Sequence, residues 1–203
     1  MKKEKQVIPI FFATDDKYIP FLAVALQSLI ENSSDTNNYV IKILYTNIEE
    51  NNMNNILKYE RENVSIEFVD LNYYINKVKD KLYTRDYYSK TTYFRLFIPD
   101  LYPQYDKVLY LDSDIVILSD IAELYNTDME DNLVAAAPDD VIQTIEVFQE
   151  YAEKVVGVAD YHNYFNAGIL LMNLDAMRKM NFQEKFLYLL GTVKFSVAQD
   201  QDY

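Results

Sequence analysis

The segment VLYLDSDIVIL (residues 108–118) places two aspartates, Asp112 and Asp114, inside a largely apolar run. An ionised carboxylate that is buried without a partner destabilises a fold, so a continuous buried strand does not explain this pair. Either a turn exposes the two side chains to solvent, or a cation binds them. The residues before Asp112 predict a strand over 107–111, buried on both faces because apolar and polar residues do not alternate along it.

Strands and helices are predicted to alternate on both sides of this segment. Further strands are predicted over 7–14, 39–46, 64–71, 133–140 and 164–174, and helices over 48–60, 86–98, 142–156 and 181–193. One more helix is expected after Asp15 and Asp16, because Leu22, Leu26 and Leu29 recur at helical spacing. The alternation predicts an α/β fold, with a mostly parallel sheet flanked by helices, in a single domain over 1–203.

The composition argues against several classes of protein. The chain has 203 residues, half of them apolar, and no cysteine, which excludes disulfides and thiolate metal sites. Its formal net charge is −13 and no basic patch is visible, so neither nucleic acid nor an anionic membrane surface is an expected partner. Only three glycines occur, and none forms a glycine-rich phosphate loop.

The beginning of the chain, MKKEKQVIPIFFATDD, is interpreted as a first strand and not as a signal peptide. Its apolar part is short, and an acidic pair follows it where a small-residue cleavage site would be needed. No apolar run reaches the roughly 18 residues that a membrane-spanning helix requires. We therefore expect a soluble, cytoplasmic protein without an integral membrane span.

Acidic residues follow three of the predicted strands. They are Asp15 and Asp16, Asp112 and Asp114, and Asp139 and Asp140. In open α/β sheets, ligands bind in the crevice outside the carboxyl ends of the strands. Aspartate is also common in turns and at helix starts, which explains any one of these pairs taken alone. Together on one edge, the three pairs favour a cation site.

The spacing of Asp112 and Asp114 points to a divalent ion. Residues i and i+2 of an extended chain point to the same side, so the two carboxylates repel each other unless a cation lies between them. Oxygen ligands suit Mg²⁺ or Mn²⁺, whereas zinc is a poor candidate with no cysteine and one histidine. That histidine, His162, is expected to lie on the surface. A hard ion at a strand end indicates phosphate or diphosphate chemistry.

Two enzyme classes carry an apolar run followed by D-x-D. DSDIV (112–116) matches the motif of haloacid-dehalogenase-like phosphatases, but a long series of predicted βα units precedes it, where that family places the motif after its first strand. The second class is matched by five blocks in order. They are PIFFATDDKYIPFLAVALQSL (9–29), TTYFRLFIPDLYPQYDKVLYLDSDIVILSDIAELY (91–125), AAAPD (135–139), YFNAGILLMNL (164–174) and QDQDY (199–203).

These blocks resemble glycosyltransferase family 8, the retaining family that includes glycogenin and bacterial lipopolysaccharide galactosyl- and glucosyltransferases. The resemblance implies the glycosyltransferase A-type (nucleotide-diphospho-sugar transferase) fold, and transfer of glucose or galactose from a UDP-sugar to a saccharide or glycolipid acceptor. Mn²⁺ or Mg²⁺ would be the cofactor, bound by Asp112 and Asp114, with Asp112 and Ser113 near the ribose. The other donor-binding positions would be Ala13, Thr14, Asp15, Tyr18, Arg95, Asp139 and Asn166.

Several of these positions also have an ordinary structural explanation. Asp15, which would accept from the uracil N–H, is equally a helix N-cap, and Tyr18, which would stack on the base, is equally a core residue. Arg95, expected near the donor phosphates, is equally a surface helix charge. Asn166 would contact the sugar, and a polar residue within a strand otherwise needs explaining. Gly168 is expected to allow close approach of a ligand or backbone.

The resemblance assigns Asp200 and Gln201 to the place beside the anomeric carbon. An amide is a poor nucleophile, which favours front-face attack with Asp200 binding the sugar, while a covalent intermediate stays open. Alternatively, residues 199–202 simply begin a polar helix. The third metal ligand of the family is a histidine that would lie beyond Tyr203, so we expect a catalytic domain that lacks its C-terminal part. Any peripheral membrane contact would come from that part. A non-catalytic nucleotide-sugar-binding module remains the further alternative.

Overall fold

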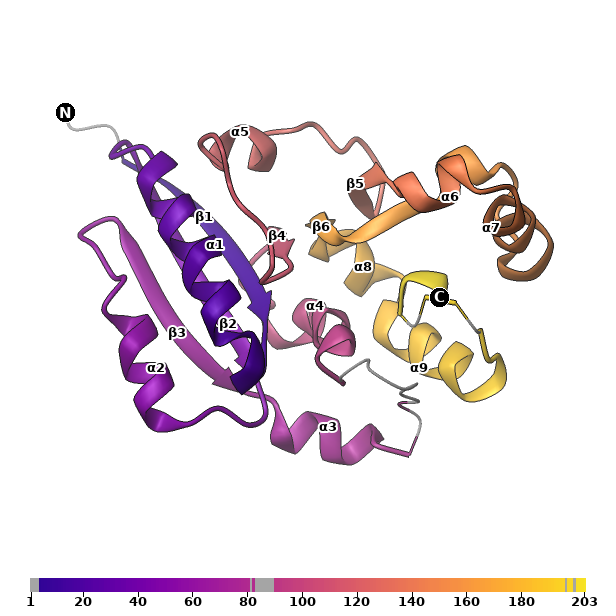
Figure 1. The fold of residues 1–203 in the computed structure, drawn as a ribbon, viewed down its shortest axis with the longest axis horizontal. Coiled ribbons are helices and arrows are strands. Elements are labelled where there is room, and N and C mark those ends of the chain that lie inside the picture. Colours follow the sequence, from indigo (N-terminus) through magenta and orange to yellow (C-terminus); the bar gives the residue numbers. More distant parts are fainter. Residues whose placement is uncertain (1–3, 81, 83–89, 196, 199) are drawn as a thin grey trace.

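The computed structural model describes residues 4–80, 82, 90–195, 197–198 and 200–203, and it contains a six-stranded sheet flanked by helices (Figure 1). The strands lie in the order β3-β2-β1-β4-β6-β5. They are β1 (Gln6–Ala13), β2 (Asn37–Tyr45), β3 (Val64–Asp70), β4 (Lys107–Leu111), β5 (Val134–Pro138) and β6 (Phe165–Asn173). The predicted α/β class and mostly parallel sheet are confirmed, and so is the first strand at the beginning of the chain.

One strand runs against the others. β1 pairs in parallel with β2 and β4, and β2 pairs in parallel with β3, whereas β6 is antiparallel to both β4 and β5. Hence β1, β4 and β5 end at the same edge of the sheet, and β6 begins there. We call this edge the rim. Because of the reversal, Asn166, the second residue of β6, lies at the rim beside Asp112 and not in the middle of a strand.

The predicted helices are present, with different boundaries. The α-helices are α1 (Ile19–Asn32), α2 (Glu50–Leu57), α3 (Asn72–Val78), α4 (Ile98–Leu101), α5 (Ala122–Tyr125), α6 (Asp140–Thr144), α7 (Glu146–Tyr151), α8 (Leu174–Lys179) and α9 (Phe182–Thr192). The 3₁₀ helices are η1 (Asp16–Tyr18), η2 (Lys90–Phe97), η4 (Tyr161–Asn163) and η5 (Asp200–Asp202), and η3 (Ala152–Val156) is a π-helix. Among these described helices, none is long and apolar enough to cross a bilayer. The cytoplasmic location stays a prediction.

Two predicted helices were wrong in detail. The helix predicted over 142–156 is interrupted at Ile145, whose extended backbone separates α6 from α7, and it ends in the π turn η3. Of the helix predicted over 86–98, residues 86–89 lie outside the described residues, 90–97 form a 3₁₀ helix, and α4 continues through Pro99. Pro99 is tolerated because it occupies the first turn of α4, where a missing N–H breaks no helical hydrogen bond.

Helices cover both faces of the sheet, which explains its continuous apolar runs. On one face, Ile10 and Phe12 of β1 pack with Leu22, Leu26 and Leu29 of α1. On the other, Phe11 of β1 and Tyr110 of β4 pack with residues of η2, α4, α8 and α9, namely Phe94, Phe97, Ile98, Met177 and Phe186. Each fully buried side chain of this kind stabilises the fold by about 1.5–3 kcal/mol.

Between β5 and β6 the chain leaves the sheet over residues 140–164, a segment that we call the excursion. Figure 1 shows its helices α6 and α7 at the end of the molecule opposite β3. The excursion has a small apolar cluster of its own, formed by Ile142, Ala152 and Tyr164 with four partly buried neighbours. It returns to the rim through Tyr164, whose carbonyl accepts a hydrogen bond from the N–H of Asp139 at 3.0 Å.

Candidate functional site

The two aspartates of the D-x-D segment lie in a turn at the rim. β4 ends at Leu111, and the N–H of Asp112 donates to the carbonyl of Gly168 in β6 at 2.7 Å. Ser113 is buried and its Oγ donates to the carbonyl of Ala13 at 3.1 Å, which fixes the turn against the end of β1. Asp114 is exposed, and the side chain of Asp112 is 38% exposed. A turn therefore brings both carboxylates to the surface of the rim.

Asp112 lies in a crowded polar environment. Its Oδ1 accepts a hydrogen bond from the Tyr110 hydroxyl at 3.1 Å and lies 3.5 Å from Nη2 of Arg95. Its Oδ2 lies over Gly168, where a Cβ atom would approach it to 2.6 Å. Burial raises the pKa of Asp112, and Arg95 and Tyr110 oppose that rise only in part. A further cation would consequently stabilise the charged form of this carboxyl group.

The donor set of the rim fits a hard divalent ion. Asp112 and Asp114 supply carboxylate oxygens, which Mg²⁺ and Mn²⁺ prefer, and such ions commonly complete their shell with water or a bound anion. Among the described residues, no cluster of three or more His, Cys, Asp or Glu side chains could hold a metal by itself. His162 is on the surface as expected, with a side chain 62% exposed and its Nδ1 2.6 Å from Asp160.

Arg95 is a buried residue, so its interpretation as a surface helix charge was wrong. It is 5% exposed, and its Nε lies 2.9 Å from Oδ2 of Asp200. Its Nη1 donates to the carbonyl of Ala167, and its guanidinium lies 4.3 Å from the centre of the Tyr110 ring. Burial alone would lower the pKa of Arg95, but the neighbouring Asp200, Tyr110 and Asp112 raise it above its ordinary value. The side chain is a fixed positive charge at the rim.

Asp200 and Gln201 come to the rim from the end of the chain. The side chain of Asp200 is 8% exposed, and burial raises its pKa while Arg95 opposes the rise. Gln201 is held at both ends of its amide: Oε1 accepts from the N–H of Ala167 at 3.0 Å, and Nε2 donates to Oδ2 of Asp139 at 2.9 Å. The structure thus brings together predicted residues that are far apart in the sequence.

Asp139 and Asn166 support this arrangement from β5 and β6. Oδ1 of Asp139 caps α6 by accepting hydrogen bonds from the N–H groups of Val141 and Ile142. Its Oδ2 accepts a hydrogen bond from Nε2 of Gln201. Oδ1 of Asn166 accepts from the N–H of Gly168 at 2.8 Å. The close approach expected at Gly168 is confirmed, and it is made by the side chains of Asp112 and Asn166.

The end of β1 forms the other part of the rim. Thr14 is buried, and its N–H donates to the carbonyl of Leu44 in β2 at 3.1 Å. Oδ1 of Asp15 accepts from the N–H groups of Lys17 and Tyr18, so this carboxylate is an N-cap, as the structural explanation predicted. Tyr18 is 46% exposed and therefore not a core residue, and its ring is available to a ligand.

Sequence reasoning missed Tyr110 and Asp202 near the rim, and it counted Asp16 among the acidic residues that favour a cation site without seeing its structural role. Tyr110 supports both Asp112 and Arg95, and its position two residues before Asp112 could have indicated a side chain on the same side. Asp16 accepts from the N–H of Glu49 and from Nδ2 of Asn52, and thereby fastens η1 to the segment before α2. Asp202 is buried, and its place in a polar run at the end of the chain gave no signal of this.

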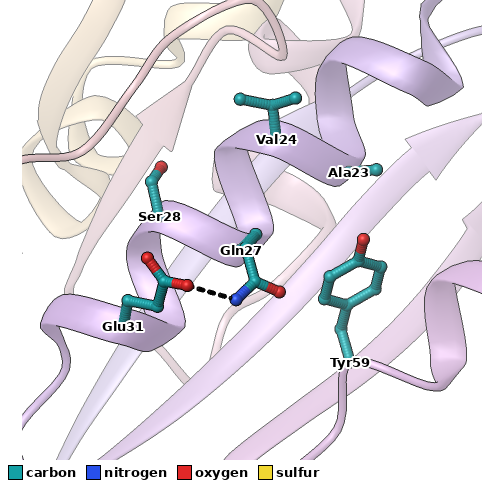
Figure 2. Close-up of a pocket in the computed structure, with 6 residues that line it drawn as sticks. All are labelled: Ala23, Val24, Gln27, Ser28, Glu31 and Tyr59. Atoms are coloured by element: carbon teal, nitrogen blue, oxygen red, sulfur yellow. Dashed lines mark hydrogen bonds between the residues drawn. The ribbon is translucent and has the colours of Figure 1, made fainter.

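Two hollows differ in their relation to the rim. A pocket of about 240 Å³ lies behind Asp200 and Gln201 and is otherwise mostly apolar, with Phe165, Leu170 and Phe186 in its wall. Figure 2 shows the second hollow, on α1. Its lining residues are Ala23, Val24, Gln27, Ser28, Glu31 and Tyr59. The Gln27 amide donates to Glu31 there at 2.6 Å, and no rim residue contributes, so this hollow is not part of the candidate site.

A comparison with protein families decides between the two enzyme classes. The profile of glycosyl transferase family 8 matches residues 9–202. The chain belongs to this family. The match contains four of the five sequence blocks completely and the fifth as far as Asp202, and it favours the glycosyltransferase interpretation over the phosphatase alternative.

Relatives from two bacteria are similar to most of this chain. A candidate glycosyltransferase of Haemophilus influenzae is 33% identical over 199 residues, which cover 97% of this chain and 58% of the relative. General stress protein A of Bacillus subtilis is 29% identical over 213 residues, which cover 100% of this chain and 69% of that protein. The chain therefore spans 58% of the length of the first relative and 69% of the length of the second.

Solved structures confirm the glycosyltransferase A-type fold. The bifunctional glycosyltransferase WbbM, in its apo form, matches with a TM-score of 0.85 and 29% identity over 98% of this chain and 37% of that one. The galactosyltransferase LgtC, solved with donor and acceptor sugar analogues, matches with a TM-score of 0.77 and 29% identity, covering 96% of this chain and 68% of LgtC.

Proposed function

We propose that this family 8 chain carries the donor site of a metal-dependent, retaining glycosyltransferase. The enzyme transfers a hexose, glucose or galactose, from a UDP-sugar to a saccharide or glycolipid acceptor. The observation that carries the proposal is the placing of Asp112 at the end of β4, within 3.5 Å of Arg95, which is paired with Asp200. The sugar analogues bound by LgtC support a sugar donor and acceptor for this chain as well.

The diphosphate is the part of the donor whose negative charge must be balanced at the site. The chain carries a formal net charge of −13 and has no glycine-rich loop, so an anion needs a local source of positive charge. Asp112 and Asp114 would hold Mn²⁺ or Mg²⁺. The buried guanidinium of Arg95, 3.5 Å from Asp112, would add a permanent positive charge. When bound, the metal would neutralise charge on the diphosphate leaving group.

The uridine binds at the end of β1. Asp15 accepts from the uracil N–H, and the exposed ring of Tyr18 supplies a stacking face. Ala13 and Thr14 line the base, and the Ser113 backbone reaches the ribose. The carbonyl of Ala13 and the side chain of Ser113 already bind each other, which supports a preformed pocket.

The hexose binds beside Asp139, Asn166, Asp200 and Gln201. Both ends of the Gln201 amide are hydrogen-bonded to the protein, which fixes its position and argues against nucleophilic attack by this residue. Transfer proceeds by front-face attack: the bond between the anomeric carbon and the diphosphate oxygen breaks while the acceptor hydroxyl oxygen bonds to the same face. The hydroxyl proton passes to the departing diphosphate. The fixed pair of Arg95 and Asp200 orients the sugar for this step.

Calorimetric titration of UDP, UDP-glucose and UDP-galactose, with Mn²⁺ or with a chelator, tests the donor. We expect UDP and at least one UDP-hexose to bind only when the metal is present, and the full-length natural protein to release UDP on turnover. Asp112→Asn and Asp114→Asn should each lose most of this affinity, whereas Asp131→Asn, a change at an exposed turn residue, should not.

Three results would point elsewhere. UDP affinity that is unaffected by the chelator would contradict the metal site. Turnover of a phosphomonoester that is lost in Asp112→Asn would favour the phosphatase. Tight binding of a UDP-hexose without release of UDP, in the presence of candidate saccharide acceptors, would favour the non-catalytic binding module.

A further inference from the structure

Asp202 is a buried charged residue that the proposed function leaves without a role. Four polar or charged side chains are buried among the described residues, namely Thr14, Arg95, Ser113 and Asp202. The first three belong to the rim. Asp202 is 3% exposed, and an ionised carboxylate at such a depth must be satisfied by specific partners.

Three hydrogen bonds satisfy this carboxylate. Its Oδ1 accepts from the Tyr164 hydroxyl at 2.6 Å, and its Oδ2 accepts from the Tyr151 hydroxyl at 2.8 Å and from the N–H of Ala198 at 2.8 Å. The N–H of Asp202 in turn donates to the carbonyl of Ala198 at 2.9 Å. Burial raises the pKa of Tyr164, which keeps its hydroxyl a donor at neutral pH. Hydrogen bonds to a carboxylate are stronger than bonds between neutral groups.

The two tyrosines belong to the excursion. Tyr151 ends α7, and Tyr164, part of the apolar cluster of the excursion, directly precedes β6. Asp202, in contrast, belongs to η5, next to Asp200 and Gln201. The network therefore connects the excursion to the turn that carries the two residues proposed to face the anomeric carbon.

The three consecutive residues of η5 attach it to three different parts of the molecule. Asp200 pairs with Arg95 of η2, Gln201 binds Asp139 and the N–H of Ala167, and Asp202 binds Tyr151 and Tyr164. A turn held at three points has little freedom to rotate, so a change at one point is transmitted to the other two.

We propose that Asp202 is a positioning residue, which fixes Asp200 and Gln201 through its hydrogen bonds to Tyr151 and Tyr164. Asp202 does not contact the sugar, because it is 3% exposed and both of its oxygens already accept hydrogen bonds. The excursion thereby sets the geometry of the rim. The kinetic part of this inference rests on the proposed function, whereas the structural part does not.

The experiment compares Asp202→Asn, Tyr164→Phe and Tyr151→Phe with Tyr188→Phe, a change at a tyrosine of α9 that is 68% exposed. In Asp202→Asn an NH₂ group replaces either Oδ1, which faces Tyr164, or Oδ2, which faces Tyr151 and the Ala198 N–H. In the first case the Tyr164 hydroxyl must turn from donor to acceptor, and in the second the Ala198 N–H has no acceptor. Each tyrosine change removes one hydroxyl and keeps the ring. If Asp202→Asn fails to fold, Tyr151→Phe still tests the network, because it leaves the bond to Tyr164 in place.

Hydrogen exchange is the first readout and needs no activity. We expect amide exchange in residues 200–203 to rise by about tenfold in Asp202→Asn and Tyr164→Phe, and less in Tyr151→Phe, while Tyr188→Phe stays at the wild-type rate. Unchanged exchange in both Asp202→Asn and Tyr164→Phe would overturn the proposal, whether or not the protein turns over a UDP-sugar.

Kinetics are the second readout. The three network variants should lower kcat for UDP release by about tenfold and leave the donor KM and the UDP Kd within about twofold of wild type. Asp202→Asn combined with Tyr164→Phe should be no worse than the poorer single variant. A kcat that falls in Asp202→Asn and in neither tyrosine variant would contradict a positioning role and indicate direct contact with substrate. A wild type without turnover refutes the proposed function alone, because the exchange result still decides the positioning role.

Discussion

The two halves of the rim are held in different ways. At the end of β1, Asp15 accepts hydrogen bonds from N–H groups only two and three residues further along the chain. Around β5, β6 and η5, side chains bind partners far away in the sequence: Gln201 binds Asp139 at a separation of 62 residues, and Arg95 binds Ala167 at a separation of 72. In the first half, which we call the local half, the Asp15 cap is made within its own turn, although Ser113 binds Ala13 from 100 residues away. The contacts of Gln201 and Arg95 in the second half, the long-range half, form only when the whole domain is folded.

This difference has an energetic consequence. In the local half the Asp15 carboxylate caps the short turn η1, and such a cap can be lost with little effect on the rest of the molecule. The long-range half contains a buried ion pair and a close approach at Gly168, in which removal of one partner leaves the other unsatisfied. Substitutions in the long-range half should therefore have the larger effects.

The largest effect is expected at Arg95. Arg95→Met leaves Asp200 buried without its partner, and we expect the free energy of unfolding to fall by about 3–5 kcal/mol in urea denaturation. Arg61→Met, at an exposed arginine, is the matched control. Adding Asp200→Asn to Arg95→Met should restore a large part of the loss, since position 200 then carries no buried unpaired charge. A double variant no more stable than Arg95→Met would show that loss of the ion pair with Asp200 does not cause the loss of stability.

Gly168→Ala should have the next largest effect. The new Cβ would lie 2.6 Å from Oδ2 of Asp112 and 2.9 Å from Oδ1 of Asn166, and both of these side chains are held by hydrogen bonds. We expect a loss of about 1–3 kcal/mol in stability and of most Mn²⁺-dependent UDP affinity, measured by calorimetry. Gly191→Ala, in α9 with nothing near its Cβ position, should instead stabilise the fold by about 0.5–1 kcal/mol. Equal behaviour of the two variants would contradict the close approach at Gly168.

Asp139 makes both kinds of contact: its Oδ1 caps α6 locally, and its Oδ2 accepts a hydrogen bond from the distant Gln201. Asp139→Ala removes the cap of α6 and should lower the free energy of unfolding by about 1 kcal/mol. Asp139→Asn keeps a capping oxygen and should keep near wild-type stability, but its NH₂ group can no longer accept from Gln201. We expect reduced UDP release from both variants. Full activity in Asp139→Asn would show that the contact to Gln201 is dispensable.

The smallest effect is expected at the end of β1, at Asp16, whose hydrogen bonds come from residues 33 and 36 positions further along the chain. Hydrogen bonds from Asn52 and from the N–H of Glu49 lower the pKa of Asp16 below its ordinary value of 3.8. Its charged form therefore stabilises the fold above the ordinary pKa, and this contribution disappears as the pH falls through the lowered value. Asp16→Asn should melt below wild type at neutral pH, and the difference should vanish in strong acid. A difference that stays constant with pH would contradict the assigned cause.

The sequence could reveal the local features because neighbouring residues determine them. The unalternating run of β4, the break at Asp112 and Asp114, and the cap at Asp15 all depend on residues within a few positions of one another. The five ordered blocks then added the family and the residues of the distant half, which no local pattern contains.

Three features could not be predicted, for physical reasons. The hydrophobic period of a strand does not encode its direction, so the reversal of β6 that brings Asn166 to the rim was not visible. The extended backbone of Ile145, which divides α6 from α7, has no local signal such as proline or glycine in the sequence. The burial of Asp202 depends on two distant tyrosine hydroxyls, and a D-Q-D run by itself is typical of an exposed surface.

The central claim is that Asp112 and Asp114 bind a divalent ion together with UDP. Electron paramagnetic resonance of free Mn²⁺, titrated into the protein with UDP present, tests it most directly. Wild type and Asp131→Asn should reduce the free Mn²⁺ signal beyond the reduction caused by UDP alone, and Asp112→Asn and Asp114→Asn should not. A wild type that leaves the signal at the level of UDP alone, or an Asp112→Asn variant that reduces it as wild type does, would contradict the account.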